Sequence, residues 1–233
     1  MRKRKWIKSD YLSPDKYLTD EEIRQLRCNV ENAAKSAAKS GSIRGRINRM
    51  LVEVMLETGL RAEEICNLEL RDLPTHHGKD VILVRCGKGG DLRVVEVKQS
   101  LKDLLQDYIK NCRKSAKPGS PLFASEAGCR AMKKRFGKNG KICYRKEQSS
   151  RLTYHDLYMR IKRIGKRAGL NHLHPHMFRH TFASHLYKVG RDLRFVQIEL
   201  GHSRPETTAR YARVFAEDAR QQIERLYQPI KPP

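Results

Sequence analysis

The sequence predicts a mainly α-helical fold with one small antiparallel β-sheet, an α+β domain. Through most of the 233 residues, apolar side chains recur every three or four positions, the spacing of a helix that buries one face. One stretch departs from this pattern, because β-branched residues flank a glycine-rich turn there and predict a β-hairpin. Hydrophobic residues make up 39% of the chain and no internal repeat divides it, so we expect a single folded domain behind a short arm.

Three helices are expected before the hairpin. Residues 1–17 are basic and are interpreted as a loosely structured N-terminal arm. Thr19 followed three positions later by Glu22 forms a capping box, which predicts that the first helix begins there. A second amphipathic helix is expected over residues 43–57, and a short third helix begins near Ala62.

The hairpin is expected to pair residues 80–85 with residues 92–98. The glycine-rich turn between these strands places Lys88 at its tip. Leucines from Leu101 onward then have the spacing of another amphipathic helix.

The C-terminal half is expected to be helical after an irregular start. Lysines and arginines crowd an exposed basic loop insertion at about residues 130–150. A helix follows over residues 153–168, and Pro175 suits the first position of the next one. A short helix over residues 193–200 and a final helix over residues 215–227 complete the chain.

The charge of the chain points to a polyanionic partner. Lysine and arginine number 49 against 26 aspartate and glutamate residues, a formal net charge of +23. A compact chain with this charge repels itself, and binding to nucleic acid is a common way to offset that repulsion. Charge alone does not separate nucleic-acid enzymes from ribosomal proteins or from proteins of anionic membranes. The candidate DNA-binding residues in the arm and the insertion are Arg2, Lys3, Arg4, Lys133, Lys134 and Arg135.

Other features argue against membrane and secreted proteins. No apolar stretch approaches the roughly 18 residues that a membrane span requires. The basic start has no apolar segment behind it, unlike a signal peptide. The six cysteines form no C-x-x-C pair, so we interpret them as reduced thiols in a cytoplasmic, nucleoid-associated protein without a structural metal site.

Two segments carry residues suited to phosphodiester chemistry. Metal-free cleavage needs cations that hold the phosphate oxygens, a nucleophile in line with the leaving oxygen, and a proton donor. Arginine suits the first task, because its planar fork meets two oxygens at once. Arg61 follows a glycine turn at a helix start, where backbone amides also favour anions, and Glu64 lies one turn further. His176 and Arg179, three positions apart, share one helix face.

A third segment begins at His202, directly after a glycine that closes a helix, and Tyr211 follows nine positions later. Lys88, at the hairpin tip, is placed to reach into a DNA groove. Each residue alone also has an ordinary explanation. His176 fits a capped or core histidine, Tyr211 a packing residue and Lys88 a solvated turn lysine, so the combination has to carry the argument.

Taken together, these segments resemble the tyrosine recombinase (phage integrase) family, close to the Xer type. The resemblance covers about residues 18–227, and its most specific parts read PHMFRHTFASHL, then VQIELGHS, then TTARY. A single H-x-x-R is common by chance. Four segments in the family order, with the family spacing from His202 to Tyr211, rarely occur together by chance.

The resemblance implies a role for each position. Tyr211 is the nucleophile, whose attack on the scissile phosphate gives a 3′-phosphotyrosyl link and a free 5′-hydroxyl. Arg61 and Arg179 hold the non-bridging oxygens, and His202 adds a hydrogen bond to them. Lys88 is the general acid that protonates the leaving 5′-oxygen.

The resemblance also implies supporting residues and partners. His176 helps to move the tyrosine proton, and Glu64 matches the acidic support position of the family. No metal ion or other cofactor is implied, because the phosphotyrosine conserves the bond energy for rejoining. The implied partner is double-stranded DNA, on which the resemblance implies a homotetramer. Whether an accessory protein is a further partner is left open by the sequence.

One feature departs from the family pattern. An N-terminal helical core-binding domain usually precedes the catalytic domain, and we expect it to be absent here, with the arm followed directly by a catalytic domain over residues 18–233. The chain is then either a fragment or a minimal recombinase. The expected function is site-specific recombination or integration of DNA by an enzyme of a mobile genetic element. The alternatives are DNA relaxation of the type IB topoisomerase kind and a non-catalytic DNA-binding relative.

Overall fold

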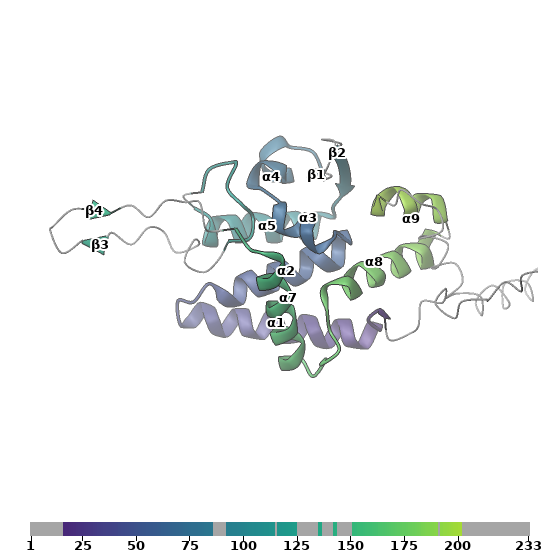
Figure 1. Cartoon of the computed structure of the whole chain (residues 1–233), viewed down its shortest axis with the longest axis horizontal. Helices are drawn as coiled ribbons and strands as arrows, with labels where there is room; N and C mark the ends of the chain where they lie inside the picture. Colours follow the sequence, from purple (N-terminus) through teal and green to yellow (C-terminus); the bar gives the residue numbers. More distant parts are fainter. Residues whose placement is uncertain are drawn as a thin grey trace, which may run out of the picture.

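The structure is a computed structural model that describes residues 16–85, 92–114, 116–124, 135–136, 142–143, 151–190 and 192–201. Over these residues it is mostly helical with little β-structure, as the sequence predicts (Figure 1). No helix among them has both the length and the hydrophobicity of a membrane span. Several predictions lie outside the described residues: most of the arm with Arg2, Lys3 and Arg4, the basic residues Lys133 and Lys134, the candidate site residues Lys88, His202 and Tyr211, and the final helix.

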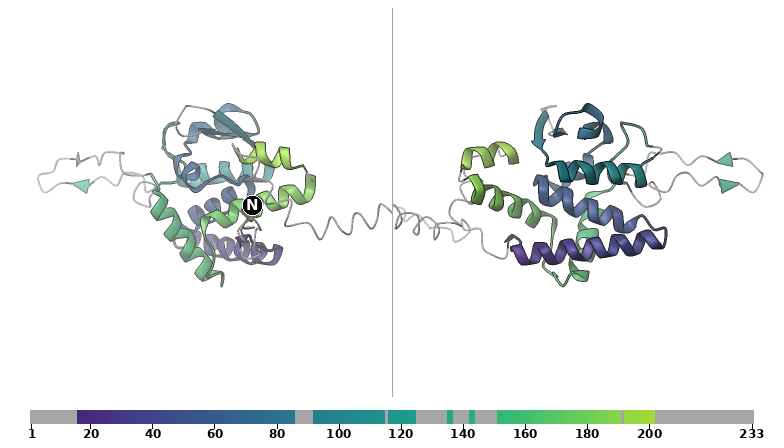
Figure 2. Two further views of the ribbon diagram at one scale, coloured as in Figure 1. Left: turned by 45° about the vertical axis from the view of Figure 1, so that its right-hand side comes forward. Right: turned by 180° about the vertical axis from the view of Figure 1, so that it is seen from behind.

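The first two helices form an antiparallel pair. Helix α1 (Asp20–Lys39) begins at the predicted capping box, in which the Thr19 hydroxyl accepts a hydrogen bond from the Glu22 backbone N–H at 3.2 Å. Helix α2 (Arg44–Thr58) is buried along most of its length. It packs against α1 on one side and α5 (Gln99–Cys112) on the other, so the three helices lie in layers (Figure 2). Helix α2 is therefore the centre of the fold.

Short elements connect α2 to the sheet. Helix α3 (Ala62–Asn67) begins where the sequence predicts a short helix, while the 3-10 turn η3 (Leu70–Asp72) and helix α4 (Pro74–His77) are additions. Strands β1 (Val81–Arg85) and β2 (Leu92–Glu96) pair antiparallel, with Val81 opposite Glu96. The predicted hairpin is confirmed over these strands.

The expected insertion contains a second strand pair. Strand β3 (Arg135–Phe136) pairs antiparallel with β4 (Ile142–Cys143), and Figure 1 places both well away from the helices. Sequence reasoning assigned no strand to this region. Arg135 is thus the first residue of a strand.

Three helices close the described part of the chain. Helix α7 (Tyr154–Arg167) begins after Thr153, whose hydroxyl accepts from the Asp156 backbone N–H at 3.1 Å. Helix α8 (Pro175–Gly190) has Pro175 at its first position, as predicted. Helix α9 (Leu193–Leu200) packs against α8 beside the C-terminal end of α2 (Figure 1). The ends of α2 and α9 are thereby brought to one side of α8.

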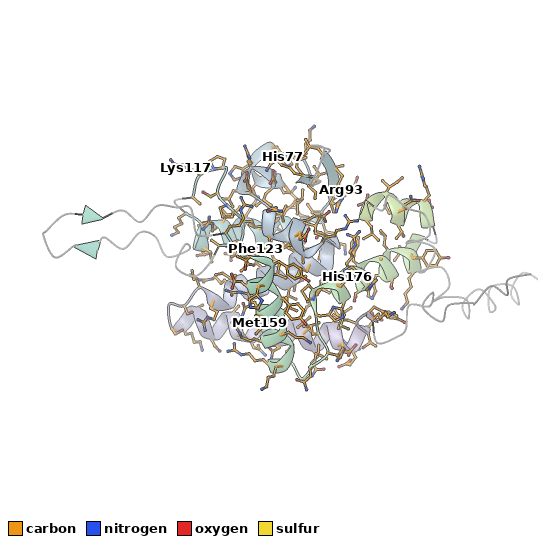
Figure 3. The ribbon with its side chains drawn as sticks, viewed as in Figure 1. His77, Arg93, Lys117, Phe123, Met159 and His176 are labelled. Carbon is orange, nitrogen blue, oxygen red and sulfur yellow. The ribbon has the colours of Figure 1, made fainter. Side chains whose placement is uncertain are left out.

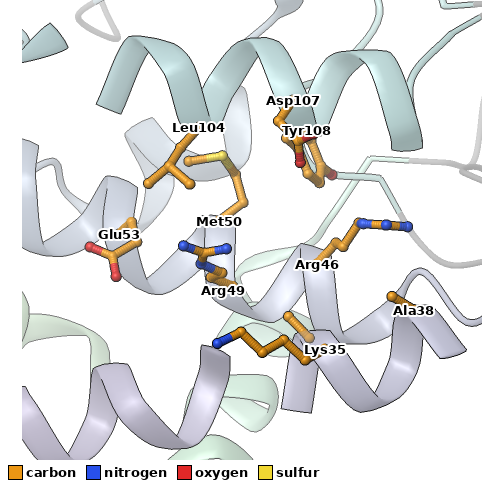
Figure 4. A pocket seen from close by; sticks show the side chains of 10 residues that line it. Lys35, Ala38, Arg46, Arg49, Met50, Glu53, Leu104, Asp107 and Tyr108 are labelled. Atoms are coloured by element: carbon orange, nitrogen blue, oxygen red, sulfur yellow. The ribbon is translucent and has the colours of Figure 1, made fainter. Parts of the chain in front are cut away.

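A cavity of about 190 Å³ lies between α1, α2 and α5 (Figure 4). Its lining combines apolar side chains, among them Met50 and Leu104, with the cationic side chains of Lys35, Arg46 and Arg49. The α2 residues of this lining run from Arg46 to Glu53 and include no candidate site residue, whereas the candidate site lies beyond the C-terminal end of α2. The cavity is therefore separate from the candidate site.

Candidate functional site

Arg179 is the buried centre of the candidate site. Its side chain lies on α8 with the residue only 2% exposed, because Met177 and Phe178 around it belong to the core. Its Nη1 donates to the Gly59 carbonyl at 2.8 Å and its Nη2 to the Leu200 carbonyl at 2.7 Å. Both carbonyls lie at helix C-terminal ends, where a cation is favoured. Arg179 thus ties α8 to the ends of α2 and α9.

The close approach of α8 to α2 requires a glycine at position 59. Gly59 ends α2 in the left-handed conformation, with φ of 59°. A Cβ atom there would lie 2.4 Å from Cδ1 of Phe182, inside van der Waals contact. Both the backbone conformation and the missing side chain therefore position the carbonyl that Arg179 binds.

Replacing Gly59 by alanine is expected to destabilise the fold by about 2–4 kcal/mol, from left-handed strain and overpacking against Phe182. Chemical denaturation of the folded protein measures this change. Gly41→Ala is the matched control, since Gly41 has φ of 68° and, among the described residues, a Cβ there would meet nothing within 4 Å. Equal losses for the two variants would show that the Phe182 contact is unimportant.

Arg61 lies at the entrance to α3, paired with Glu64. Its Nη1 donates to Glu64 Oε1 at 2.9 Å, and its backbone N–H donates to Glu64 Oε2 at 2.7 Å. Its Nη2 donates to the Gly201 carbonyl at 3.1 Å, across 140 positions of the chain. Both terminal nitrogens of the Arg61 guanidinium are therefore hydrogen-bonded. The side chain is nevertheless 43% exposed, so the guanidinium faces solvent.

Sequence reasoning missed a second arginine on Glu64. Nη2 of Arg93, on β2, donates to Glu64 Oε2 at 2.8 Å. A signal for it exists in the strand alternation: Leu92 and Val94 are exposed at 63% and 54%, whereas Val95 is fully buried. Arg93 shares the inward face with Val95, and a charge on the inner face of a strand is unusual enough to be noticed.

Glu64 remains ionised between the two arginines. Burial acts to raise the pKa of its carboxyl, but the positive charge of Arg93 and the bonds from Arg61 outweigh burial and hold that pKa below its ordinary value. Two guanidinium groups, those of Arg61 and Arg93, thus share this carboxylate, and a third, that of Arg179, binds the neighbouring carbonyls of Gly59 and Leu200. The excess positive charge suits an anionic ligand such as a phosphodiester.

His176 and His180 are neighbours on α8. Their rings meet edge to face, with centroids 4.5 Å apart. Partial burial, followed by the positive charges of Arg179, His174 and Arg61, lowers the pKa of His176. Burial, followed by the charge of His176, lowers the pKa of His180 to about 3. Both imidazoles are therefore neutral at pH 7, and the solvent-accessible His176 is able to accept a proton.

Acid is expected to destabilise the protein through His180. Its folded-state pKa lies below the ordinary value, so the unfolded chain binds the proton more readily, and stability is lost as pH falls from about 6.5 toward 3. The expected loss between pH 7 and pH 4.5 is on the order of 2–3 kcal/mol. His180→Gln should flatten the pH dependence of the unfolding free energy between pH 7 and pH 4.5. An unchanged slope in His180→Gln would contradict this assignment.

The described residues end at Gly201, just before the candidate residues His202 and Tyr211. Gly201 ends α9 with φ of 61° and directly precedes His202. The structure thus brings together Arg61, His176 and Arg179, with Glu64 in support, and holds the backbone that leads to His202. Among the described residues, no group of three or more histidine, cysteine or acidic side chains is arranged to hold a metal ion.

The sequence resembles known proteins along most of its length. Residues 16–218 match the family model described as the phage integrase family, a range that includes every candidate residue from Arg61 to Tyr211. The chain is 28% identical over 210 residues to the tyrosine recombinase XerA of Pyrococcus horikoshii. That match covers 90% of this chain and 61% of the relative, so the chain spans less than two thirds of the relative's length.

The fold resembles solved structures of similar proteins. A crystal structure of XerA recombinase matches with a TM-score of 0.66 and 26% identity, over 92% of this chain and 66% of that one. A pre-cleavage complex of the site-specific recombinase XerH with its difH substrate matches with a TM-score of 0.62 and 27% identity. This second match covers 88% of this chain and 52% of the other.

Proposed function

Because the chain belongs to the phage integrase family and has an Xer-like catalytic domain, we propose that it is a site-specific DNA recombinase that breaks and rejoins strands through a 3′-phosphotyrosyl intermediate. The observation that carries this proposal is the cluster of Arg61, Glu64 and Arg179 beside the backbone that leads to His202. Its substrate is double-stranded DNA, whose phosphates complement a chain of net charge +23.

The cluster is suited to holding a phosphate during attack. Arg61 and Arg179 bind the non-bridging oxygens of the scissile phosphate and stabilise the additional negative charge of the transition state. Arg179 is oriented in advance by two carbonyls, and Arg61 by Glu64 and Gly201. Since these contacts exist before DNA binds, little reorganisation is needed at the moment of reaction.

The covalent step exchanges one phosphate ester for another. Oη of Tyr211 forms a bond to phosphorus, and its proton leaves toward the neutral imidazole of His176. The bond between phosphorus and the 5′-oxygen breaks, and that oxygen takes a proton from Lys88. His202 donates a hydrogen bond to the phosphate. Rejoining reverses each transfer, so the strand break consumes no external energy source.

The assembly on DNA is part of the same proposal. We infer that four copies assemble on two DNA duplexes within the nucleoid of the cytoplasm, with an accessory protein as a further partner. The arm residues Arg2, Lys3 and Arg4 and the insertion residues Lys133, Lys134 and Arg135 would add contacts to the DNA backbone. Such contacts orient a protein on DNA without reading its sequence.

Covalent trapping tests the proposal. The protein is incubated with nicked duplexes that tile the flanking genomic sequence, from which the cleaved end diffuses away, and the products are run on a denaturing gel. A slow band that a protease removes is the expected result. Intact DNA binding without such a band at any duplex would indicate a non-catalytic DNA-binding relative instead.

Product analysis then separates recombination from relaxation. Two duplexes of different length that carry the trapped site are expected to give recombinant products of hybrid length. Relaxation of a supercoiled plasmid without any hybrid product would instead indicate a topoisomerase-like activity.

A further inference from the structure

Arg93 lies where three segments of the site meet, although no motif includes it. It comes from β2 and its side chain is 13% exposed, and Figure 3 places it between the hairpin and α9. Besides the bond to Glu64, it packs tightly on Gly201: a Cβ atom at that glycine would lie 2.7 Å from Arg93 Nε. Its side chain therefore lies against both residues that orient Arg61, Glu64 and Gly201.

These contacts form a closed ring of four residues. Arg61 Nη1 binds Glu64 Oε1 at 2.9 Å, Glu64 Oε2 binds Arg93 Nη2 at 2.8 Å, Arg93 packs on Gly201, and the Gly201 carbonyl binds Arg61 Nη2 at 3.1 Å. The ring joins β2, α3 and the end of α9. A shift of Arg93 is therefore transmitted to Arg61 from two sides.

Arg93 is costly as a purely structural residue. Within the described part of the chain, its Nε and Nη1 are buried and have no hydrogen-bond acceptor. Unpaired buried donors reduce stability, and local rules of this kind are mostly broken at functional sites. This loss of stability indicates that Arg93 is retained because of the residues that it positions.

Resting on the proposed function, we propose that Arg93 is a positioning residue for strand cleavage: it fixes Glu64 against Arg61 and supports the backbone at Gly201, from which His202 follows. In the sequence, Lys88 lies between the two strands of the hairpin that carries Arg93. Arg93 therefore sets the position of the hairpin base relative to the phosphate-binding arginine.

Another arginine of the same hairpin provides the matched control. Arg85, on β1, also binds carboxylates, with Nη1 at 3.2 Å from both Glu69 and Asp72. Asp72 is buried, so Arg85→Met leaves a buried carboxylate without its guanidinium partner and should reduce stability. Among the described residues, no hydrogen bond or ion pair joins Arg85 to the ring. Arg93→Met, in contrast, leaves Glu64 still paired with Arg61.

The test separates DNA binding, cleavage and folding. Single-turnover cleavage of the nicked duplex, the Kd for the same DNA and the unfolding midpoint are measured for Arg93→Met, Arg93→Lys and Arg85→Met. Arg93→Met is expected to slow cleavage by about 10- to 100-fold, the scale of a misplaced reacting group, with Kd changed less than about threefold. Arg93→Lys keeps the charge but not the fork, so it should recover part of the rate. Arg85→Met should lower the unfolding midpoint more and the cleavage rate less.

A double variant provides the decisive comparison. Because Arg93 acts on Arg61 through both Glu64 and Gly201, the variant that combines Arg93→Met with Glu64→Gln should lose less cleavage than the product of the two single losses. Wild-type cleavage by Arg93→Met, or fully additive losses in the double variant, would overturn the assignment to Arg93 alone. Failure of the unchanged protein to form any covalent complex would overturn the proposed function, and this inference with it.

Discussion

Replacing Tyr211 by phenylalanine is expected to abolish covalent attachment of the protein to DNA. The change removes only the Oη atom, which the proposed mechanism requires as the nucleophile, and keeps the aromatic ring. Removing a nucleophile of this kind typically reduces the rate by at least about 10⁴-fold. DNA affinity depends mainly on phosphate contacts and should remain within about twofold. Denaturing gels of the nicked duplex measure attachment, and native gels measure binding.

A second tyrosine controls for the chemical change itself. Tyr154 begins α7 and is 53% exposed, so Tyr154→Phe removes a hydroxyl that the mechanism does not use. This variant should form the covalent complex at the rate of the unchanged protein. Attachment by Tyr211→Phe at that same rate would show that another side chain is the nucleophile, and the roles assigned from His202 to Tyr211 would then fail together.

Local patterns were sufficient to predict most of the described elements. The capping box at Thr19 marks the start of α1, and the apolar spacing over residues 43–57 matches α2 to within one residue at each end. The glycine-rich turn between two β-branched runs predicts β1 and β2. Each of these signals lies within a few residues of the element it specifies, which is why sequence alone suffices.

Very short elements escaped prediction for a related reason. Helix α4 and strands β3 and β4 have four or fewer residues, too few for an apolar period to repeat. Pro74 at the first position of α4 and Gly78, left-handed at its C-cap, are the local signals of that helix. Such segments are determined by the neighbours on which they fold.

The candidate site shows the same division between local sequence signals and long-range contacts. Arg61, Glu64, His176 and Arg179 stand out because their residue types and spacing suit phosphate chemistry. Their arrangement depends on contacts across 120 and 140 positions of the chain, from Arg179 to Gly59 and from Arg61 to Gly201. Arg93 belongs to no motif, and only its hydrogen bond to Glu64 identifies it as part of the site. Sequence therefore identifies the chemical groups, and the fold identifies the residue that connects them.

Replacing Arg179 is expected to produce the second-largest loss of cleavage. Arg179→Ala removes a cation that the proposed mechanism places on the scissile phosphate, and such a loss typically costs about 10²- to 10³-fold in rate, or roughly 3–4 kcal/mol. It also leaves the buried carbonyls of Gly59 and Leu200 without their donor, so the free energy of unfolding should fall by about 2–4 kcal/mol. Cleavage rates must therefore be normalised to the folded fraction, measured by denaturation under the assay conditions.

A conservative change separates the chemical role of Arg179 from its structural role. Arg179→Lys keeps the positive charge on α8, but an ammonium cannot reproduce the planar fork that meets two carbonyls and a phosphate together. Cleavage per folded molecule should remain at least about tenfold below that of the unchanged protein. The control is Thr181→Ala on the same helix, which removes a buried hydroxyl that accepts from the Leu18 backbone N–H at 2.8 Å. It should lower stability without slowing cleavage. If Arg179→Lys cleaves normally, Arg179 serves to hold α2, α8 and α9 together, and the phosphate must be bound by other groups.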